Sequence, residues 1–224
     1  MSILSLFLIA FSLKPYALTP ETRVYDLLLK GSLQGTYYID VDTATYEGER
    51  AYRITYWAVR KGNEGEKSHF FFSAKSFRPF YSRKVITGVE SNSVIEALYE
   101  EDSIRLKLKS PSGEKELLFP RDDSTFDNSS LYMILSALDF RKKPSGTIRV
   151  VLLVQGSALT ADYSAGEVRE VEVNGSKIRV YPVTLKLLDK EIEVLYEAAP
   201  PHRLVRYLEM DSGSGFILRE VEKK

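Results

Sequence analysis

The amino-acid sequence predicts a mainly β protein, in which a strongly curved antiparallel sheet or half-barrel is covered by a single mid-chain helix. Three observations favour this fold class. Apolar residues recur with a period of two from Thr22 onward, which is the spacing of half-buried strands. Turn-forming residues separate these runs at short intervals. One segment in the middle of the chain changes to a helical period, and its apolar face needs a sheet to cover.

The strands expected before the helix are marked by alternation of their side chains. Residues 37–42 and 52–59 alternate in this way, and residues 104–109 do so most clearly. In that last segment the two faces are Ile104, Leu106 and Leu108 on one side and Arg105, Lys107 and Lys109 on the other. One face of the strand must therefore contact apolar neighbours while the other contacts water.

The strands expected after the helix begin with a hairpin. The Asn174-Gly175 pair supplies the two positive φ angles of a type I′ turn, and it would join residues 168–173 to residues 177–180. Pro182 follows, and the inward set shifts there from Ile178 and Val180 to Val183, Leu185 and Leu187. A missing amide together with this shift predicts a bulge or an edge position. Further strands at residues 192–196, 203–209 and 216–221 bring the total to roughly six on each side of the helix.

The helix is predicted from one apolar stripe. Its members stand at positions i, i+3, i+4 and i+7, and they are Leu131, Ile134, Leu135 and Leu138. Asp127 is the expected N-cap, and Phe126 before it would pack on the first turn. Basic residues 141–143 and then Pro144 would end the helix after two to four turns. No linker or repeat divides residues 18–224, so we expect a single β-rich domain.

The N-terminus has the character of a secretory signal. Residues 3–13 are apolar except for two serines, which is too short for a membrane span but fits the core of a signal peptide. We therefore expect residues 1–17 to be removed, with no stable transmembrane span after cleavage, and the protein to be exported to the periplasm or cell envelope. The alternative is a buried N-terminal strand or helix.

No cysteine is present in the sequence, which excludes disulfides, thiolate chemistry and lipid attachment to cysteine.

Composition argues against several function classes. The 31 basic and 31 acidic residues are interleaved and give zero net charge, so we expect no nucleic-acid partner. The two histidines, His69 and His202, lie in no metal-binding spacing and are interpreted as surface or turn residues. No motif for a nucleophilic serine or for phosphate binding occurs. We therefore expect no catalytic residues, no metal and no cofactor.

An enzyme based on paired carboxylates is the less favoured alternative. Strand alternation already explains why Asp40 and Asp42, and likewise Glu191 and Glu193, share one face of a strand. The entry to the helix explains the pair Asp122 and Asp123.

Aromatic residues are the one compositional feature above background. The chain has 14 Tyr, 11 Phe and 1 Trp, and many lie between residues 37 and 81. On strands they would either line a concave apolar cavity or form a packed core beneath the helix. If a cavity exists, its expected lining residues are Tyr37, Ile39, Tyr52, Ile54, Tyr56, Leu131 and Leu135.

Three segments carry a resemblance to a known family. They are the helix DNSSLYMILSAL at residues 127–138, the strand pair VNGSKIRVYPV at residues 173–183, and the closing stretch IEVLYEAAPPHRLVRYLE at residues 192–209. Together they resemble an uncharacterised family of exported bacterial β-rich domains, the domain of unknown function family 3108. The family has no assigned catalysis, so the resemblance implies no catalytic residues. At the level of fold it is similar to the open half-barrels of lipoprotein- and lipid-carrying envelope proteins.

These observations favour a non-catalytic extracytoplasmic domain that binds a hydrophobic or amphipathic ligand, such as a lipid or a lipidated partner. The alternative is a structural or assembly module of the cell envelope that pairs with an envelope protein and has no ligand cavity.

Removal of the leader is directly testable. N-terminal sequencing of the protein from its host is expected to begin between Tyr16 and Thr19, because the small residue Ala17 ends the leader. An intact Met1 on secreted or cytosolic protein would contradict this expectation.

Overall fold

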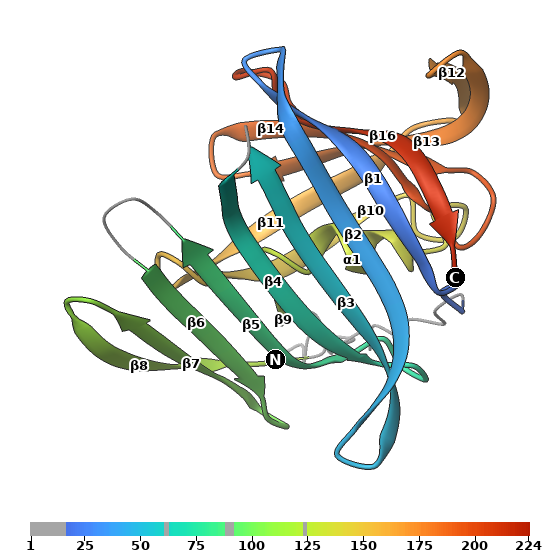
Figure 1. Ribbon diagram of the computed structural model, residues 1–224. Helices are drawn as coiled ribbons and strands as arrows, with labels where there is room; N and C mark the ends of the chain where they lie inside the picture. The colour runs from blue at the N-terminus through green and yellow to red at the C-terminus, as the bar shows by residue number, and fades with distance from the viewer. Residues whose placement is uncertain (1–16, 61–62, 88–91, 123–124) are drawn as a thin grey trace, which may run out of the picture.

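The computed structural model describes residues 17–60, 63–87, 92–122 and 125–224, so all but the last residue of the expected leader lies outside the described residues. The predicted fold class is confirmed, because long strands curve around one short helix (Figure 1). More strands form than the roughly six expected on each side of the helix. Short, largely exposed runs also become strands, and β8, whose first four residues are all exposed, is an example.

The elements have the following bounds in chain order: β1 (Glu21–Leu29), β2 (Ser32–Tyr46), β3 (Glu49–Arg60), β4 (Asn63–Ser73), β5 (Pro79–Thr87), β6 (Asn92–Tyr99), β7 (Ser103–Ser110), β8 (Gly113–Pro120), β9 (Thr125–Asp127), α1 (Leu131–Ser136), β10 (Ser145–Leu152), β11 (Ser157–Ala165), β12 (Arg169–Val173), β13 (Ser176–Leu187), β14 (Lys190–Glu197), β15 (Leu204–Glu209) and β16 (Ser214–Lys223).

All of these strands belong to one sheet, with the order β8-β7-β6-β5-β4-β3-β2-β1-β16-β15-β14-β13-β11-β10-β9 and with β12 beside β13. Every pairing is antiparallel except that of β9 with β10. The two ends of this order, β8 and β9, are not paired with each other, so the sheet is open there. Val151 near the end of β10 and Leu153 just after it pack instead on residues of β6, β7 and β8.

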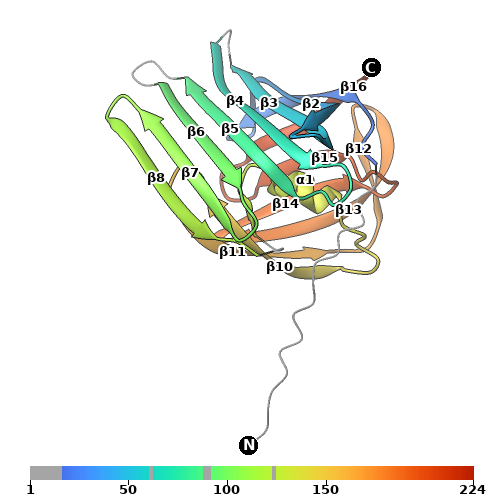
Figure 2. The ribbon, with the colours of Figure 1, turned by 90° about the horizontal axis from the view of Figure 1, so that it is seen from below.

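The helix lies inside the curve of the sheet. Figure 2 shows α1 between the β3–β7 side and the side formed by β10, β11, β13 and β14. All of its residues except Tyr132 are buried, including the predicted Leu131, Ile134 and Leu135 and also Met133. Because α1 lies between two sides of the sheet, more than one face of the helix is buried. The predicted apolar stripe therefore includes only some of the buried residues of α1. With six residues in α1, no helix in the described chain is long and apolar enough to cross a bilayer.

The predicted helix bounds were wrong at both ends. Ser130, not Asp127, is the N-cap, and its side chain makes no capping hydrogen bond. Asp127 still organises the entry, because its Oδ1 accepts hydrogen bonds from the backbone N–H groups of Ser129 and Ser130 at 2.8 and 2.9 Å. The helix ends at Ser136, well before the basic residues 141–143, since the N–H groups of Ala137 and Leu138 bond to carbonyls only three residues back.

The bulge expected at Pro182 is absent, because β13 pairs with β14 without any shift of register. The change of inward residues has another cause. Val180 packs in a small cluster with Leu195 and Val205, whereas Val183 belongs to the main core on the other face. Pro182 lies where the pairing of β13 passes from β12 to β11, so its missing N–H falls in a gap between partners. The hairpin turn at Asn174-Gly175 is confirmed, with φ angles of 50° and 74°.

A buried ion cluster joins the start of β1 to the start of β15. Arg203 donates to Glu21 at 3.0 and 3.1 Å, and Arg23 donates to the same carboxylate at 2.6 Å. Burial alone would raise the pKa of Glu21, but the hydrogen bonds and positive charges of the two arginines hold it below its ordinary value. The carboxylate is therefore ionised at neutral pH and holds together the end of the sheet where β1 begins.

Shortening a buried side chain of α1 tests the structural role of this helix. Ile134→Ala is expected to lower the free energy of unfolding by about 2–5 kcal/mol, since Ile134 is fully buried and its loss leaves a cavity. The matched control is Leu118→Ala on β8, where the side chain is 62% exposed and the expected change is within about 0.5 kcal/mol. Equal effects in urea unfolding would contradict the placement of α1.

Candidate functional site

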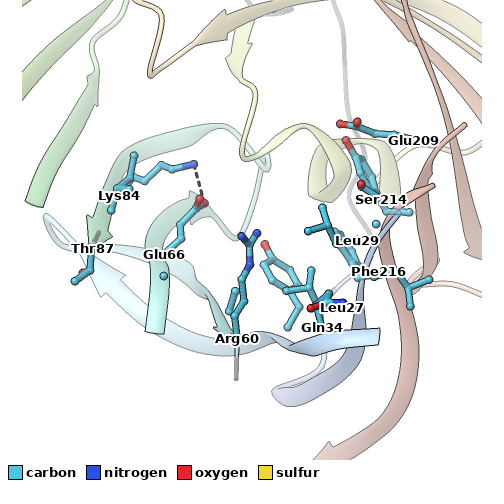
Figure 3. Close-up of a pocket in the computed structure, with 17 residues that line it drawn as sticks. Leu27, Leu29, Gln34, Arg60, Glu66, Lys84, Thr87, Glu209, Ser214 and Phe216 are labelled. Carbon is cyan, nitrogen blue, oxygen red and sulfur yellow. Dashed lines mark ion pairs between the residues drawn. The ribbon is translucent and has the colours of Figure 1, made fainter. Parts of the chain in front are cut away.

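A cavity of about 650 Å³ opens at one end of the curved sheet (Figure 3). It lies where β1, β3 and β5 end and where β2, β4 and β16 begin. The lining residues are Leu27, Leu28, Leu29, Gln34, Tyr37, Ala58, Arg60, Gly65, Glu66, Lys84, Ile86, Thr87, Tyr207, Glu209, Ser214, Gly215 and Phe216. Its volume falls in the range of about 300–1,000 Å³ that is typical of small-molecule sites.

One wall of the cavity is apolar. It is formed by β1, β15 and β16, and its main members are Leu27, Leu28, Leu29, Tyr207 and Phe216. The ring of Phe216 stacks on Tyr207 with centroids 5.1 Å apart and on Tyr37 with centroids 4.6 Å apart. Stacked aromatic rings hold one another in place, so this wall is a preformed apolar surface.

A tyrosine of the helix supports the cavity from inside the sheet. The hydroxyl of Tyr132 lies 2.9 Å from that of Tyr37, and its ring meets Tyr56 edge-on at 5.4 Å. Burial raises the pKa of the Tyr37 phenol well above its ordinary value, and the charge of Glu66 raises it further. Burial likewise raises the pKa of Tyr132. Both phenols therefore stay neutral at physiological pH.

The opposite wall is polar and comes from β3, β4 and β5. Lys84 points inward, and its Nζ forms an ion pair with Oε1 of Glu66 at 2.7 Å (Figure 3). The Lys84 side chain is only 10% exposed, whereas that of Glu66 is 43% exposed. Arg60 is exposed at the end of β3, and its guanidinium makes no hydrogen bond or ion pair with any residue that the structure describes.

Buried hydroxyl groups continue the polar wall toward the core. Strand register places Tyr56, Ser68 and Lys84 directly opposite one another on β3, β4 and β5. The hydroxyls of Tyr56 and Ser68 are buried and, within the described parts of the chain, have no hydrogen-bond partner. A buried hydroxyl without a partner costs about 1–3 kcal/mol of stability. This side of the molecule therefore retains polar groups that packing alone does not explain.

Two glycines allow strands to approach closely at the cavity. A Cβ atom on Gly35 would lie 2.1 Å from the carbonyl oxygen of Val59, and one on Gly215 would lie 2.0 Å from that of Tyr207. No other residue fits at either position without moving the backbone. Both glycines lie in strands that contribute to the cavity walls, so close packing of the strands at this end depends on them.

The structure distributes the seven predicted lining residues over several places. Tyr37 lines the cavity described above. Ile39, Ile54 and Tyr56 are buried in the main core. Leu131 and Leu135 line a hollow of only about 80 Å³ beside β13, β14 and β15. Tyr52 borders a groove of about 670 Å³ that also includes Ala17, where the described chain begins. Whether any of the seven contacts a ligand stays a prediction.

Sequence reasoning missed most of the cavity. The wall from β1, β15 and β16 joins distant parts of the chain, and no local pattern indicates that pairing. Interior strand glycines were one available signal, because a glycine inside a strand marks a bulge or a close approach. Gly35, Gly65 and Gly215 all lie beside or in the cavity wall.

The histidines and carboxylates lie elsewhere. His202 is in a turn as predicted, but it is buried, with Nδ1 2.9 Å from the carbonyl oxygen of Glu197 and with Phe140 and Tyr181 beside its ring. Asp40 and Asp42 both form ion pairs with Lys224. In the described part of the chain, no three or more His, Asp or Glu side chains are placed to hold a metal ion.

Comparison with solved structures supports the fold. The chain is similar to a β-barrel-like protein of the domain of unknown function DUF1849 from Brucella abortus, with a TM-score of 0.61 and 14% sequence identity. The match covers 92% of this chain and 98% of the other. No model of a protein family and no curated protein matches the chain. A likeness at this identity shows an uncharacterised β-rich fold and does not identify family 3108.

Two phenylalanine variants test the hydroxyl groups of the site. Tyr132→Phe is expected to lower the free energy of unfolding by about 1 kcal/mol, because it removes the hydrogen bond to Tyr37. Tyr56→Phe is expected to be neutral or stabilising, because its hydroxyl has no partner among the described residues. Urea unfolding of the ligand-free protein measures both. A loss of 1 kcal/mol or more for Tyr56→Phe would show that its hydroxyl is satisfied in solution.

Proposed function

We propose that this protein is a non-catalytic binding domain whose cavity at the end of the sheet holds a hydrophobic or amphipathic ligand. The observation that carries the proposal is the opposition of an apolar wall on β1, β15 and β16 to a polar wall on β3, β4 and β5. A ligand with an apolar part and a polar group matches both walls. Burial of each methylene group contributes about 0.8 kcal/mol, so a chain of about ten methylene groups contributes about 8 kcal/mol, which is comparable to the cost of association.

Export to the periplasm or cell envelope is part of the same proposal. Its support is the apolar segment at residues 3–13, together with the resemblance of residues 127–138, 173–183 and 192–209 to family 3108. In an envelope, acyl chains of lipids and lipidated proteins are abundant ligands of the required kind. Membership of that family belongs to the proposal as well.

An envelope assembly module without a ligand is the alternative function. Such a module would pair through a free sheet edge, and β8 is one such edge. The residues of β8 include Glu114, Lys115 and Glu116, all exposed. Charged side chains on an edge strand oppose pairing with another chain. Ligand binding in the cavity is therefore the better supported of the two functions.

Filling the cavity tests the proposed function. Ala58 lies on the inner face of β3 and lines the cavity, so Ala58→Trp is expected to lower the affinity for the uncharged dye N-phenyl-1-naphthylamine at least tenfold. The matched control is Val59→Trp, which places the same ring on the opposite face of the same strand. Dye fluorescence measures binding, and circular dichroism checks that both variants are folded.

Two results would contradict the proposal. One is the absence of dye binding to the unmodified protein, together with no copurifying lipid by native mass spectrometry. The other is an equal loss of dye affinity in the Ala58→Trp and Val59→Trp variants.

A further inference from the structure

We propose that the ligand is an amphipathic anion, whose negatively charged head group lies between Lys84 and Arg60 while its tail contacts the wall formed by β1, β15 and β16. This inference rests on the proposed function and specifies the chemistry of the ligand. It follows from the charges of the cavity, from the donors beneath it and from the separation of the polar and apolar walls.

The polar wall carries excess positive charge. Its charged residues are Arg60, Glu66 and Lys84, and Glu66 is already paired with Lys84 at 2.7 Å. Arg60 makes no ion pair with any described residue. The remaining charged lining residue, Glu209, lies on the other wall and pairs with Lys190 at 3.3 Å. One cation at the cavity is thus left without a counter-ion from the described chain.

Two buried hydroxyl groups lie in the row of Lys84 and can donate hydrogen bonds, as the two cations do. The hydroxyls of Tyr56 and Ser68 lie in the same cross-strand row as Lys84, and both are buried without a partner in the described segments. The ammonium of Lys84 and the guanidinium of Arg60 can only donate. A carboxylate or phosphate group brings several acceptor oxygens, and charged acceptors form the strongest hydrogen bonds with such donors.

The arrangement disfavours other head groups. An alkylammonium would have to compete with Lys84 for Glu66, at a position where the lysine is nearly buried. An alcohol brings a single oxygen and no charge, so it leaves Arg60 uncompensated. In the view of Figure 3, the labelled side chains of Lys84 and Glu66 lie on one side, those of Leu29 and Phe216 lie on the other, and Arg60 lies between them. A free inorganic anion would leave this apolar side exposed to water.

Competition with the bound dye tests the charge of the head group. Dodecanoate, dodecyl phosphate, dodecanol and dodecylamine are compared at concentrations below micelle formation, with acetate and inorganic phosphate as anions without a tail. The two dodecyl anions are expected to displace the dye at about tenfold lower concentration than dodecanol or dodecylamine. Acetate and phosphate are expected to leave the dye bound at the same concentrations.

Variants of the polar wall test the location. Lys84→Met is expected to weaken dodecanoate binding about tenfold, and Arg60→Gln about threefold because Arg60 is more exposed. Glu66→Gln is expected to strengthen dodecanoate binding, since it removes the carboxylate that competes for Lys84. The readout for all three is the affinity for dodecanoate relative to that for dodecanol, because both compounds fill the same cavity and differ only in the head group. Lys107→Met, an exposed lysine on the outer face of β7, is the control and is expected to change neither affinity.

The outcomes separate this inference from the proposed function. If Ala58→Trp blocks dye binding but dodecanoate competes no better than dodecanol, the cavity binds apolar ligands and the anionic head group is wrong. Preferential binding of dodecylamine, displacement of the dye by inorganic phosphate, or weaker dodecanoate binding in Glu66→Gln would also overturn the inference. If neither dye nor any dodecyl compound binds, the proposed function fails as well. If Lys84→Met does not fold, the two more exposed positions, Arg60 and Glu66, decide the result.

Discussion

The fold depends on covering the inner face of one long sheet. Side chains alternate between the two faces of every strand, so a sheet of this length presents many apolar groups on its concave side. Curvature brings parts of that face together, and α1 fills the space between them with residues such as Met133, Ile134 and Leu135. Six residues of helix are sufficient because the two walls of the sheet are close enough for α1 to contact both.

The same constraint explains why the cavity lies at the end of the sheet. The helix occupies the middle of the concave face and extends only one aromatic side chain, Tyr132, toward the end where β1 and β3 finish. Beyond Tyr132 the strands continue without a covering element from the described chain. Their inward residues are mainly apolar on β1 and β16, whereas β3, β4 and β5 also contribute charged and hydroxyl groups, such as Lys84 and Ser68. A chain selected only for a solid core would not need Lys84 in such a position.

The predictable part of the molecule was the part governed by local periodicity. Alternation identified the buried residues Ile39, Ile54 and Ile104, and the Asn174-Gly175 turn was correct, because both depend on neighbouring residues only. The length of α1 was overestimated, since tertiary contacts and not the apolar stripe decide where it ends. The polar wall was not recognised, because both faces of β5 mix polar and apolar residues and its alternation does not reveal which face Lys84 occupies. The apolar wall depends on the pairing of β1 with β16, which no local pattern predicts.

The pairing of β1 with β16 has a consequence for biosynthesis. Phe216 on β16 lies opposite Leu27 on β1 in this ladder. The apolar wall therefore forms only after β16, the last strand of the sheet, has been synthesised and has paired with β1. A nascent chain that has already formed strands β2 to β8 still lacks the apolar wall of the cavity. Contacts between such distant residues form slowly in folding. Under the proposed function, ligand binding would therefore require the complete polypeptide, because a chain shortened before β15 retains Arg60 and Lys84 but lacks Tyr207 and Phe216 of the apolar wall.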